Sequence, residues 1–208
     1  AMTRALIDAA KEANEAVVDT THPDSTNAAS ATFAAAVIAP DRVHYANLGD
    51  SRVYFIGASQ QVLLSVDDSM AQAFIEQDMP RAEAEAMPRA HAITKWLGRD
   101  SLDIVPRTGV HELTEPGWLV VCSDGLWNYA SDPAELAAQV AAAGSTTTDP
   151  VAVAQALVAW ANAQGGQDNV TVALARCAGV PASAVSDGRS SLGEAPNDRP
   201  GKEQPANG

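Results

Sequence analysis

The chain opens with a stretch whose apolar residues recur at helical spacing. Between residues 3 and 20 one face is apolar and the opposite face is mostly charged; the apolar stripe comprises Leu6, Ala9, Ala10, Ala13 and Val17. Apolar residues three and four positions apart lie on the same face of an α-helix. The pattern predicts an amphipathic helix over 3–20, which ends before Pro23 because proline disfavours helical geometry in the residue that precedes it.

Short strand-like runs follow this helix. They cover residues 32–39, 42–48, 52–56 and 61–64. Residues typical of turns stand between them, at Pro40-Asp41, Gly49-Asp50 and Gly57-Ala58-Ser59. Strands that are joined by tight turns pair with their neighbours in antiparallel fashion. This part of the chain is therefore predicted to form an antiparallel meander.

Helical and extended patterns alternate in blocks along the rest of the chain. A helical period returns over 67–86; strand-like runs then cover 102–105, 108–113 and 118–122, helical runs cover 133–143 and 150–163, and a last strand covers 170–176. Strands in runs with helices grouped between them are typical of a layered α+β domain. We expect an α+β fold with mainly antiparallel sheets.

The composition changes near the end of the chain. After Ala178 the residues are mostly Gly, Pro, Ser, Ala and charged, with almost no large apolar side chains. Such segments cannot bury enough apolar surface to offset the entropy of ordering. Of the 208 residues, we expect 1–177 to form one domain and 178–208 to be a disordered tail.

The charge balance argues against several classes of partner. With 13 Lys and Arg against 26 Asp and Glu the formal net charge is −13, which repels nucleic acid and anionic lipid. No apolar run approaches the roughly 20 residues that a membrane-spanning helix needs. Cys122 and Cys177 stand in apolar runs and are interpreted as buried thiols. We therefore expect a cytoplasmic protein that binds neither nucleic acid nor membrane.

Three aspartates stand beside glycines at the ends of predicted strands. They are Asp50 in NLGDSR, Asp124 in VCSDGLWN and Asp168 in GGQDNVT. Carboxylates that converge from separate strand ends suit hard divalent cations such as Mg²⁺ and Mn²⁺. Each also has a simpler interpretation: Asp50 as a turn residue, Asp168 as a cap of the last strand, and Asp124 as a charge paired within the protein at the edge of the core.

Other catalytic chemistries find little support. The four histidines, His22, His44, His91 and His111, show no common spacing that would indicate a zinc site. Cys122 has no neighbouring His or basic residue to lower its pKa, so it is interpreted as structural. Ser123 lacks the G-x-S-x-G setting of a hydrolase nucleophile.

Five motifs in a fixed order resemble a known family. NLGDSRVYFI, SVDDS, HAITKWLG, CSDGLWNY and GGQDNVTVAL, preceded by the strand ATFAAAVI, are similar to those of the PPM family, the metal-dependent type 2C Ser/Thr protein phosphatases, in their bacterial form. The resemblance extends over about residues 3–177. It implies a sandwich of two antiparallel sheets flanked by helices (αββα), with a metal centre at one end of the sheets.

The resemblance also implies roles for individual residues. Asp124 and Asp168 would bind one of two core metals, Mg²⁺ or Mn²⁺. Asp50 would help to bind a third, weaker metal together with Asn128, which stands where the family usually has an Asp. The stretch from Asp67 to Gly98 would form a flap beside the cleft, and the usual Asp-His-Ser there is Asp67-Asp68-Ser69 in this chain.

The implied activity is hydrolysis of phosphoserine and phosphothreonine in proteins. A metal-bridging water would attack phosphorus directly, and no Cys or Ser nucleophile would be needed. The implied partners are phosphorylated proteins and a Ser/Thr kinase that the phosphatase opposes.

One part of the family pattern is not found in the sequence. The family carries, near its N-terminus, a phosphate-binding Arg and an Asp-Gly-x-Gly-Gly segment whose Asp bridges the core metals; neither is present. We therefore expect a fold that is incomplete at its N-terminal side. Two hypotheses follow: the chain is a fragment of a longer phosphatase, or it is a catalytically inactive relative that works as a binding or regulatory module.

Overall fold

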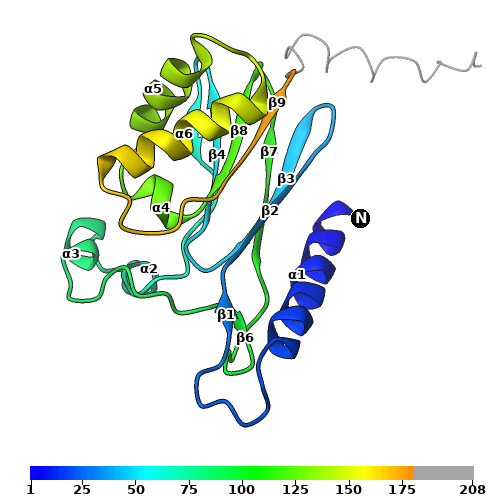
Figure 1. The fold of residues 1–208 in the computed structure, drawn as a ribbon, viewed down its shortest axis with the longest axis vertical. Helices are drawn as coiled ribbons and strands as arrows, with labels where there is room; N and C mark the ends of the chain where they lie inside the picture. Colours follow the sequence, from blue (N-terminus) through cyan, green and yellow to red (C-terminus); the bar gives the residue numbers. More distant parts are fainter. Residues whose placement is uncertain (180–208) are drawn as a thin grey trace, which may run out of the picture.

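The computed structural model describes residues 1–179. Residues 180–208, which make up most of the tail expected at 178–208, lie outside the described residues. The described part contains nine strands and six helices arranged in layers (Figure 1). Within it, no helix combines the length and apolar character that crossing a membrane requires.

Two antiparallel sheets form the centre of the molecule. The first contains β2 (Phe33–Ile38), β3 (Arg42–Leu48) and β7 (Arg107–Glu112) in the order β2-β3-β7. The second has the order β5-β4-β8-β9 and consists of β5 (Gln61–Leu63), β4 (Arg52–Gly57), β8 (Gly117–Cys122) and β9 (Val172–Cys177). A short ribbon of β1 (Ser30–Ala31) and β6 (Leu97–Gly98) lies beside them. The α+β class is confirmed. The predicted meander is confirmed for the antiparallel pairs β2–β3 and β4–β5 but is wrong for β3 and β4, because the chain crosses from one sheet to the other between them.

Helices cover the outer faces of both sheets. The first helix, α1 (Met2–Asp19), packs on β3, β2 and β6 through its apolar stripe, of which Leu6 and Ala10 are buried. On the other side, α5 (Pro133–Gly144) and α6 (Pro150–Gln164) pack on the four-stranded sheet, and the short α4 (Asp124–Trp127) lies at its end (Figure 1). The layers therefore follow the αββα order that the resemblance implies.

Two apolar cores hold these layers together. The core between the sheets comprises Val43, Val53, Phe55, Leu113, Leu119 and Cys177. The core beneath α5 and α6 includes Tyr54, Ile56, Val120, Cys122, Leu136, Val140, Val153 and Leu157. Alternate residues of β4 and β8 enter different cores because successive side chains of a strand point to opposite faces. β4 and β8 are buried on both faces for this reason.

The sheets contain three and four strands. β2 and β9 are each hydrogen-bonded to one neighbour only within residues 1–179, so both are edge strands there.

Two predicted elements differ from the structure. The helix expected over 67–86 is two helices, α2 (Met70–Ile75) and α3 (Arg81–Glu85), because Asp78 adopts a left-handed φ of 66° and Pro80 precedes α3. The strand expected over 102–105 is a loop with a fully exposed Leu102. Among residues 1–179 no strand pairs with this segment.

Candidate metal site

Asp50 lies in the short turn, residues 49–51, that leads from β3 in one sheet to β4 in the other. Gly49, which precedes it, has a φ of 94°, a conformation that glycine adopts without strain. A Cβ at Gly49 would also collide with the side chain of Thr32. Asp50 is half-buried, and within residues 1–179 its carboxylate forms no salt bridge. The turn thus presents a carboxylate without a cationic partner in the described structure.

Asp124 begins α4 directly after β8. Gly125 is buried, and a Cβ there would collide with the main-chain carbonyl of Asn169. The missing side chain therefore allows the start of α4 to lie directly against the loop between α6 and β9. Asp168 belongs to that loop.

Hydrogen bonds fix the contact between these two segments. The Ser123 hydroxyl donates to the carbonyl of Asn169 at 3.1 Å and accepts from the amide of Thr171 at 3.0 Å, and the Ser123 amide donates to the carbonyl of Thr171. Asp124 and Asp168 directly adjoin residues in this network. Asp168 itself is exposed and lines an open cavity of about 570 Å³ at the end of α6.

Asp50 and Asp124 lie beyond the same end of a strand pair. In the register of β4 and β8, Arg52 is opposite Cys122, so the residues two positions beyond each of them leave the sheet at one edge. The indole N–H of Trp127 in α4 donates to the main-chain carbonyl of Asp50 at 2.8 Å. The structure therefore brings the Asp50 turn and the helix of Asp124 together.

The charges of the three aspartates interact. Burial raises the pKa of Asp50 from 3.8 to about 6, and the charge of Asp124 adds to this rise. Burial also raises the pKa of Asp124, and Asp168 contributes in the same direction. A nearby positive charge would relieve this repulsion. The electrostatics of these carboxylates therefore fit a bound cation.

Asn128 is the C-cap of α4, and its main-chain N–H donates to the main-chain carbonyl of Asp124 at 2.9 Å. Its side chain is exposed. The structure thus places Asn128 one helical turn after Asp124 and on the surface.

The donor set suits a hydrated hard cation. Mg²⁺ and Mn²⁺ bind carboxylate oxygens, and Mg²⁺ in particular retains several waters. The part of the chain that the structure describes contains no group of three His, Cys, Asp or Glu residues placed to hold a metal ion together. Asp124 thus interacts with Asp50 and with Asp168 as two pairs of carboxylates, and the three do not form one ready-made ligand group in the described residues.

An ion-paired network beside these aspartates was missed by the sequence reasoning. Arg52 binds Asp67 through Nε and Nη2, at 3.0 and 2.7 Å, and its guanidinium lies 3.6 Å from the centre of the Trp127 ring. Asp68 pairs with Arg107. The two consecutive aspartates of SVDDS were a signal that arginine partners exist. The sequence does not show which arginines these are, because they lie 15 and 39 positions away.

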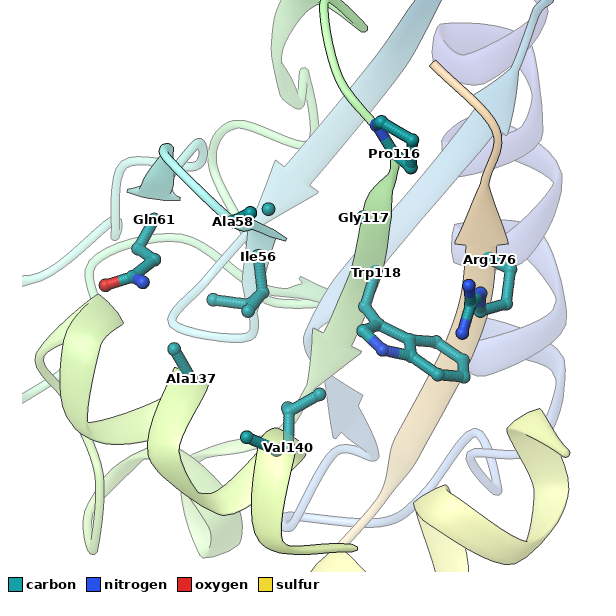
Figure 2. Close-up of a pocket in the computed structure, with 11 residues that line it drawn as sticks. Ile56, Ala58, Gln61, Pro116, Gly117, Trp118, Ala137, Val140 and Arg176 are labelled. Atoms are coloured by element: carbon teal, nitrogen blue, oxygen red, sulfur yellow. The ribbon is translucent and has the colours of Figure 1, made fainter. Parts of the chain in front are cut away.

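A second cavity lies at the opposite end of the four-stranded sheet. This cavity has a volume of about 310 Å³. Figure 2 shows the residues that line it, among them Ile56, Gly117 and Val140. The Arg176 guanidinium lies over the Trp118 ring there, 4.7 Å from its centre. No acidic residue lines this cavity, so it adds no ligand to the metal site.

Comparison with known proteins agrees with the motifs. Residues 1–162 match the family model described as Protein phosphatase 2C. A putative protein phosphatase 2C-type protein of Streptococcus pyogenes is 27% identical over 81% of this chain and 67% of its own length. Protein phosphatase PhpP of Streptococcus pneumoniae is 33% identical over 69% of this chain and 56% of its own length.

A solved structure shows the same fold. The S. agalactiae serine/threonine phosphatase superposes with a TM-score of 0.67 at 28% identity, over 83% of this chain and 69% of that chain. The chain thus spans between about half and two thirds of the two curated relatives. The family match covers most of the chain, in agreement with the order of its motifs and with its layered sheets. The chain belongs to the protein phosphatase 2C family.

Proposed function

We propose that this chain carries metal-binding carboxylates of a phosphatase site that hydrolyses phosphoserine and phosphothreonine in proteins. The observation that supports it is that Asp124 lies within electrostatic reach of both Asp50 and Asp168 at one end of the sheets: burial, and after it the charge of the neighbouring acid, raises the pKa values of Asp50 and Asp124. The phosphatase relatives lend support at the level of the family.

The residues have separate tasks in this proposal. Asp124 and Asp168 would hold Mg²⁺ or Mn²⁺, and Asp50 with Asn128 would hold a further, weaker ion. Such ions, when bound, lower the pKa of a coordinated water and offset negative charge on a phosphoryl group. The carboxylates must be ionised to bind a cation, which the burial of Asp50 and Asp124 opposes until the cation arrives.

The structure also supports the positions of these ligands relative to the fold. Asp50 and Asp124 leave adjacent strands of a rigid sheet, and sites on such elements keep their geometry better than sites on free loops. Asp168 comes from a loop that the Ser123 hydrogen bonds tie to the start of α4. Neither Cys122 nor Ser123 takes part in the reaction.

We further propose that the protein acts in the cytoplasm on proteins phosphorylated by a Ser/Thr kinase. Cys122 and Cys177 are both buried and free thiols, which suits a reducing compartment.

The experiment measures Mn²⁺ binding and Mn²⁺-dependent release of phosphate from a phosphothreonine peptide. The chain should bind Mn²⁺, and Asp124→Ala and Asp168→Ala should each remove the tighter Mn²⁺ site and lower the release of phosphate, while the weaker ion at Asp50 and Asn128 is retained. Glu12→Gln is the matched control, because Glu12 is an exposed acid on α1 and its loss should change neither. Normal Mn²⁺ binding by a folded Asp124→Ala variant would contradict the proposed site.

A binding or regulatory module is the second candidate. It is favoured by the absence, among residues 1–179, of a closed group of three metal ligands. Such a module would bind the phosphopeptide without releasing phosphate. Phosphate release that depends on Asp124 would exclude it.

A further inference from the structure

Two consecutive aspartates fasten the segment before α2 to both sheets. Asp67 pairs with Arg52 of β4, in the four-stranded sheet, and both side chains are largely buried. Asp68 pairs with Arg107 of β7, in the three-stranded sheet, with 2.7 Å between Oδ1 and Nε. The segment therefore bridges the two sheets at the edge where Asp50 lies.

Asp68 is also bonded to the turn that carries Asp50. Its Oδ2 accepts from the amide of Gly49 at 3.2 Å, and its own amide donates to the carbonyl of Gly49 at 2.8 Å. Only 1% of Asp68 is exposed. Both polar groups of the Gly49 main chain are thus held by one buried residue, immediately before the candidate ligand.

The positive charge of Arg107 compensates the buried carboxylate of Asp68. A buried carboxylate is costly unless it is paired and hydrogen-bonded. Arg107 also binds Glu76, at the end of α2, through Nη2 at 2.9 Å. In addition, the carbonyl of Asp68 accepts from the amide of Thr94 at 2.8 Å. Asp68 therefore joins the Gly49-Asp50 turn, the three-stranded sheet and Thr94, which follows the segment that contains α2 and α3.

We propose that Asp68, held by Arg107, is a positioning residue that fixes the Gly49-Asp50 turn and thereby sets the affinity for a divalent cation of the weaker ion site to which Asp50 belongs. This inference rests on the proposed function, since it assigns Asp68 a role at the same site. Asp68 does not touch the cation in this scheme. It acts through the main chain of Gly49 on the carboxylate of Asp50.

The first test is amide hydrogen exchange of the metal-free full chain. Asp68→Ala removes both side-chain bonds, and exchange of the peptide containing Gly49 and Ser51 should become at least about tenfold faster. Arg107→Met, which leaves the Asp68 bonds to Gly49 possible, should accelerate the same peptide to a smaller extent and serves if Asp68→Ala fails to fold. The control is Asp103→Asn, which breaks the ion pair with Lys95 and should leave this peptide unchanged.

The second test is the affinity for Mn²⁺ alone, measured by electron paramagnetic resonance of the free ion. Loss of a residue that orients a metal ligand weakens metal binding by about tenfold or more. Asp68→Ala should therefore weaken the lower-affinity Mn²⁺ site by this factor, and Asp103→Asn should leave it unchanged. Arg107→Lys, which keeps the charge, should recover part of the affinity lost in Arg107→Met.

The outcomes separate the two proposals. Wild-type chain that binds no Mn²⁺ would contradict the proposed function, and the exchange experiment would still decide whether Asp68 holds the turn. Folded Asp68→Ala and Arg107→Met variants with wild-type exchange at Gly49 would overturn the positioning role, as would wild-type affinity for Mn²⁺ in both.

Discussion

The indole N–H of Trp127 donates a 2.8 Å hydrogen bond to the main-chain carbonyl of Asp50. Trp127 is buried, and its ring also carries the guanidinium of Arg52 on one face. One aromatic side chain thus links the helix of Asp124, the turn of Asp50 and the neighbouring ion-paired network. This link makes the geometry of the proposed site depend on the packing of α4.

Replacement of Trp127 by Phe should destabilise the protein. The variant keeps an aromatic ring beneath Arg52 but leaves the Asp50 carbonyl without its donor, which costs about 1–2 kcal/mol for a partly buried acceptor. Urea unfolding followed by circular dichroism measures the change. Trp96→Phe is the control, because the Trp96 N–H binds the exposed Asp100, and it should change stability by less than about 0.5 kcal/mol. Equal effects of the two substitutions would contradict this interpretation.

Arg52→Met should destabilise the fold by about 3 kcal/mol, since it leaves the largely buried carboxylate of Asp67 without its partner. It also removes the interaction with the Trp127 ring. The same substitution at Arg42, whose pair with Asp41 is exposed, should have almost no effect. Chemical denaturation of both variants provides the comparison, and a loss at Arg42 as large as that at Arg52 would show that burial is not the cause.

Gly125→Ala should separate the start of α4 from the loop of Asp168. The new Cβ would collide with the carbonyl of Asn169, and strain of this kind costs about 1–3 kcal/mol. We expect a lower midpoint of thermal unfolding and weaker Mn²⁺ binding.

Gly144→Ala is the matched control for this substitution. Gly144 ends α5, and a Cβ there would have nothing within 4 Å. Because Ala favours the helix over Gly, stability should stay the same or rise by up to about 1 kcal/mol. If Gly125→Ala proved as neutral as Gly144→Ala, the close approach at Gly125 would not be needed to hold the site.

His111 should make stability depend on pH. It packs against Phe55 between the sheets, with ring centres 4.9 Å apart, and burial lowers its pKa below 6.5 despite the opposing charge of Glu112. The unfolded chain therefore binds a proton more readily than the folded chain does. The free energy of unfolding should fall as the pH drops below about 6.5.

His111→Leu should remove this contribution. The difference in unfolding free energy between wild type and variant, followed from pH 7.5 to about pH 5, isolates the effect of His111 from that of the acids, which titrate in both proteins. A difference that stays constant over this range would contradict the role given to His111.

The cysteines should be unreactive in the native protein. Burial raises the pKa of Cys122 to about 12 and also raises that of Cys177, whereas the thiolate is the reactive form. Ellman's reagent at pH 8 should label neither thiol until urea unfolds the chain. Rapid labelling of the folded protein would show that at least one thiol is accessible.

The sequence by itself determined the local helices and strands and the positions of the candidate metal ligands. Helix α1 was predicted over 3–20 and lies at Met2–Asp19, because the spacing of apolar side chains reflects the helical period directly. The turn at Gly49-Asp50 and the end of the strand at Cys122 were equally clear, since Gly and Asp at strand ends have local backbone preferences; the short helix α4 that follows Cys122 was not predicted. Short-range sterics governs all these features.

Only the tertiary structure decided which segments meet. The loop at 102–105 has apolar residues but pairs with no strand in the described structure, and a strand exists only where its hydrogen bonds find a partner. The pairs of Asp67 with Arg52 and of Asp68 with Arg107 join residues 15 and 39 positions apart in the chain. Sequence spacing does not show such pairs, because the packing of two sheets brings them together.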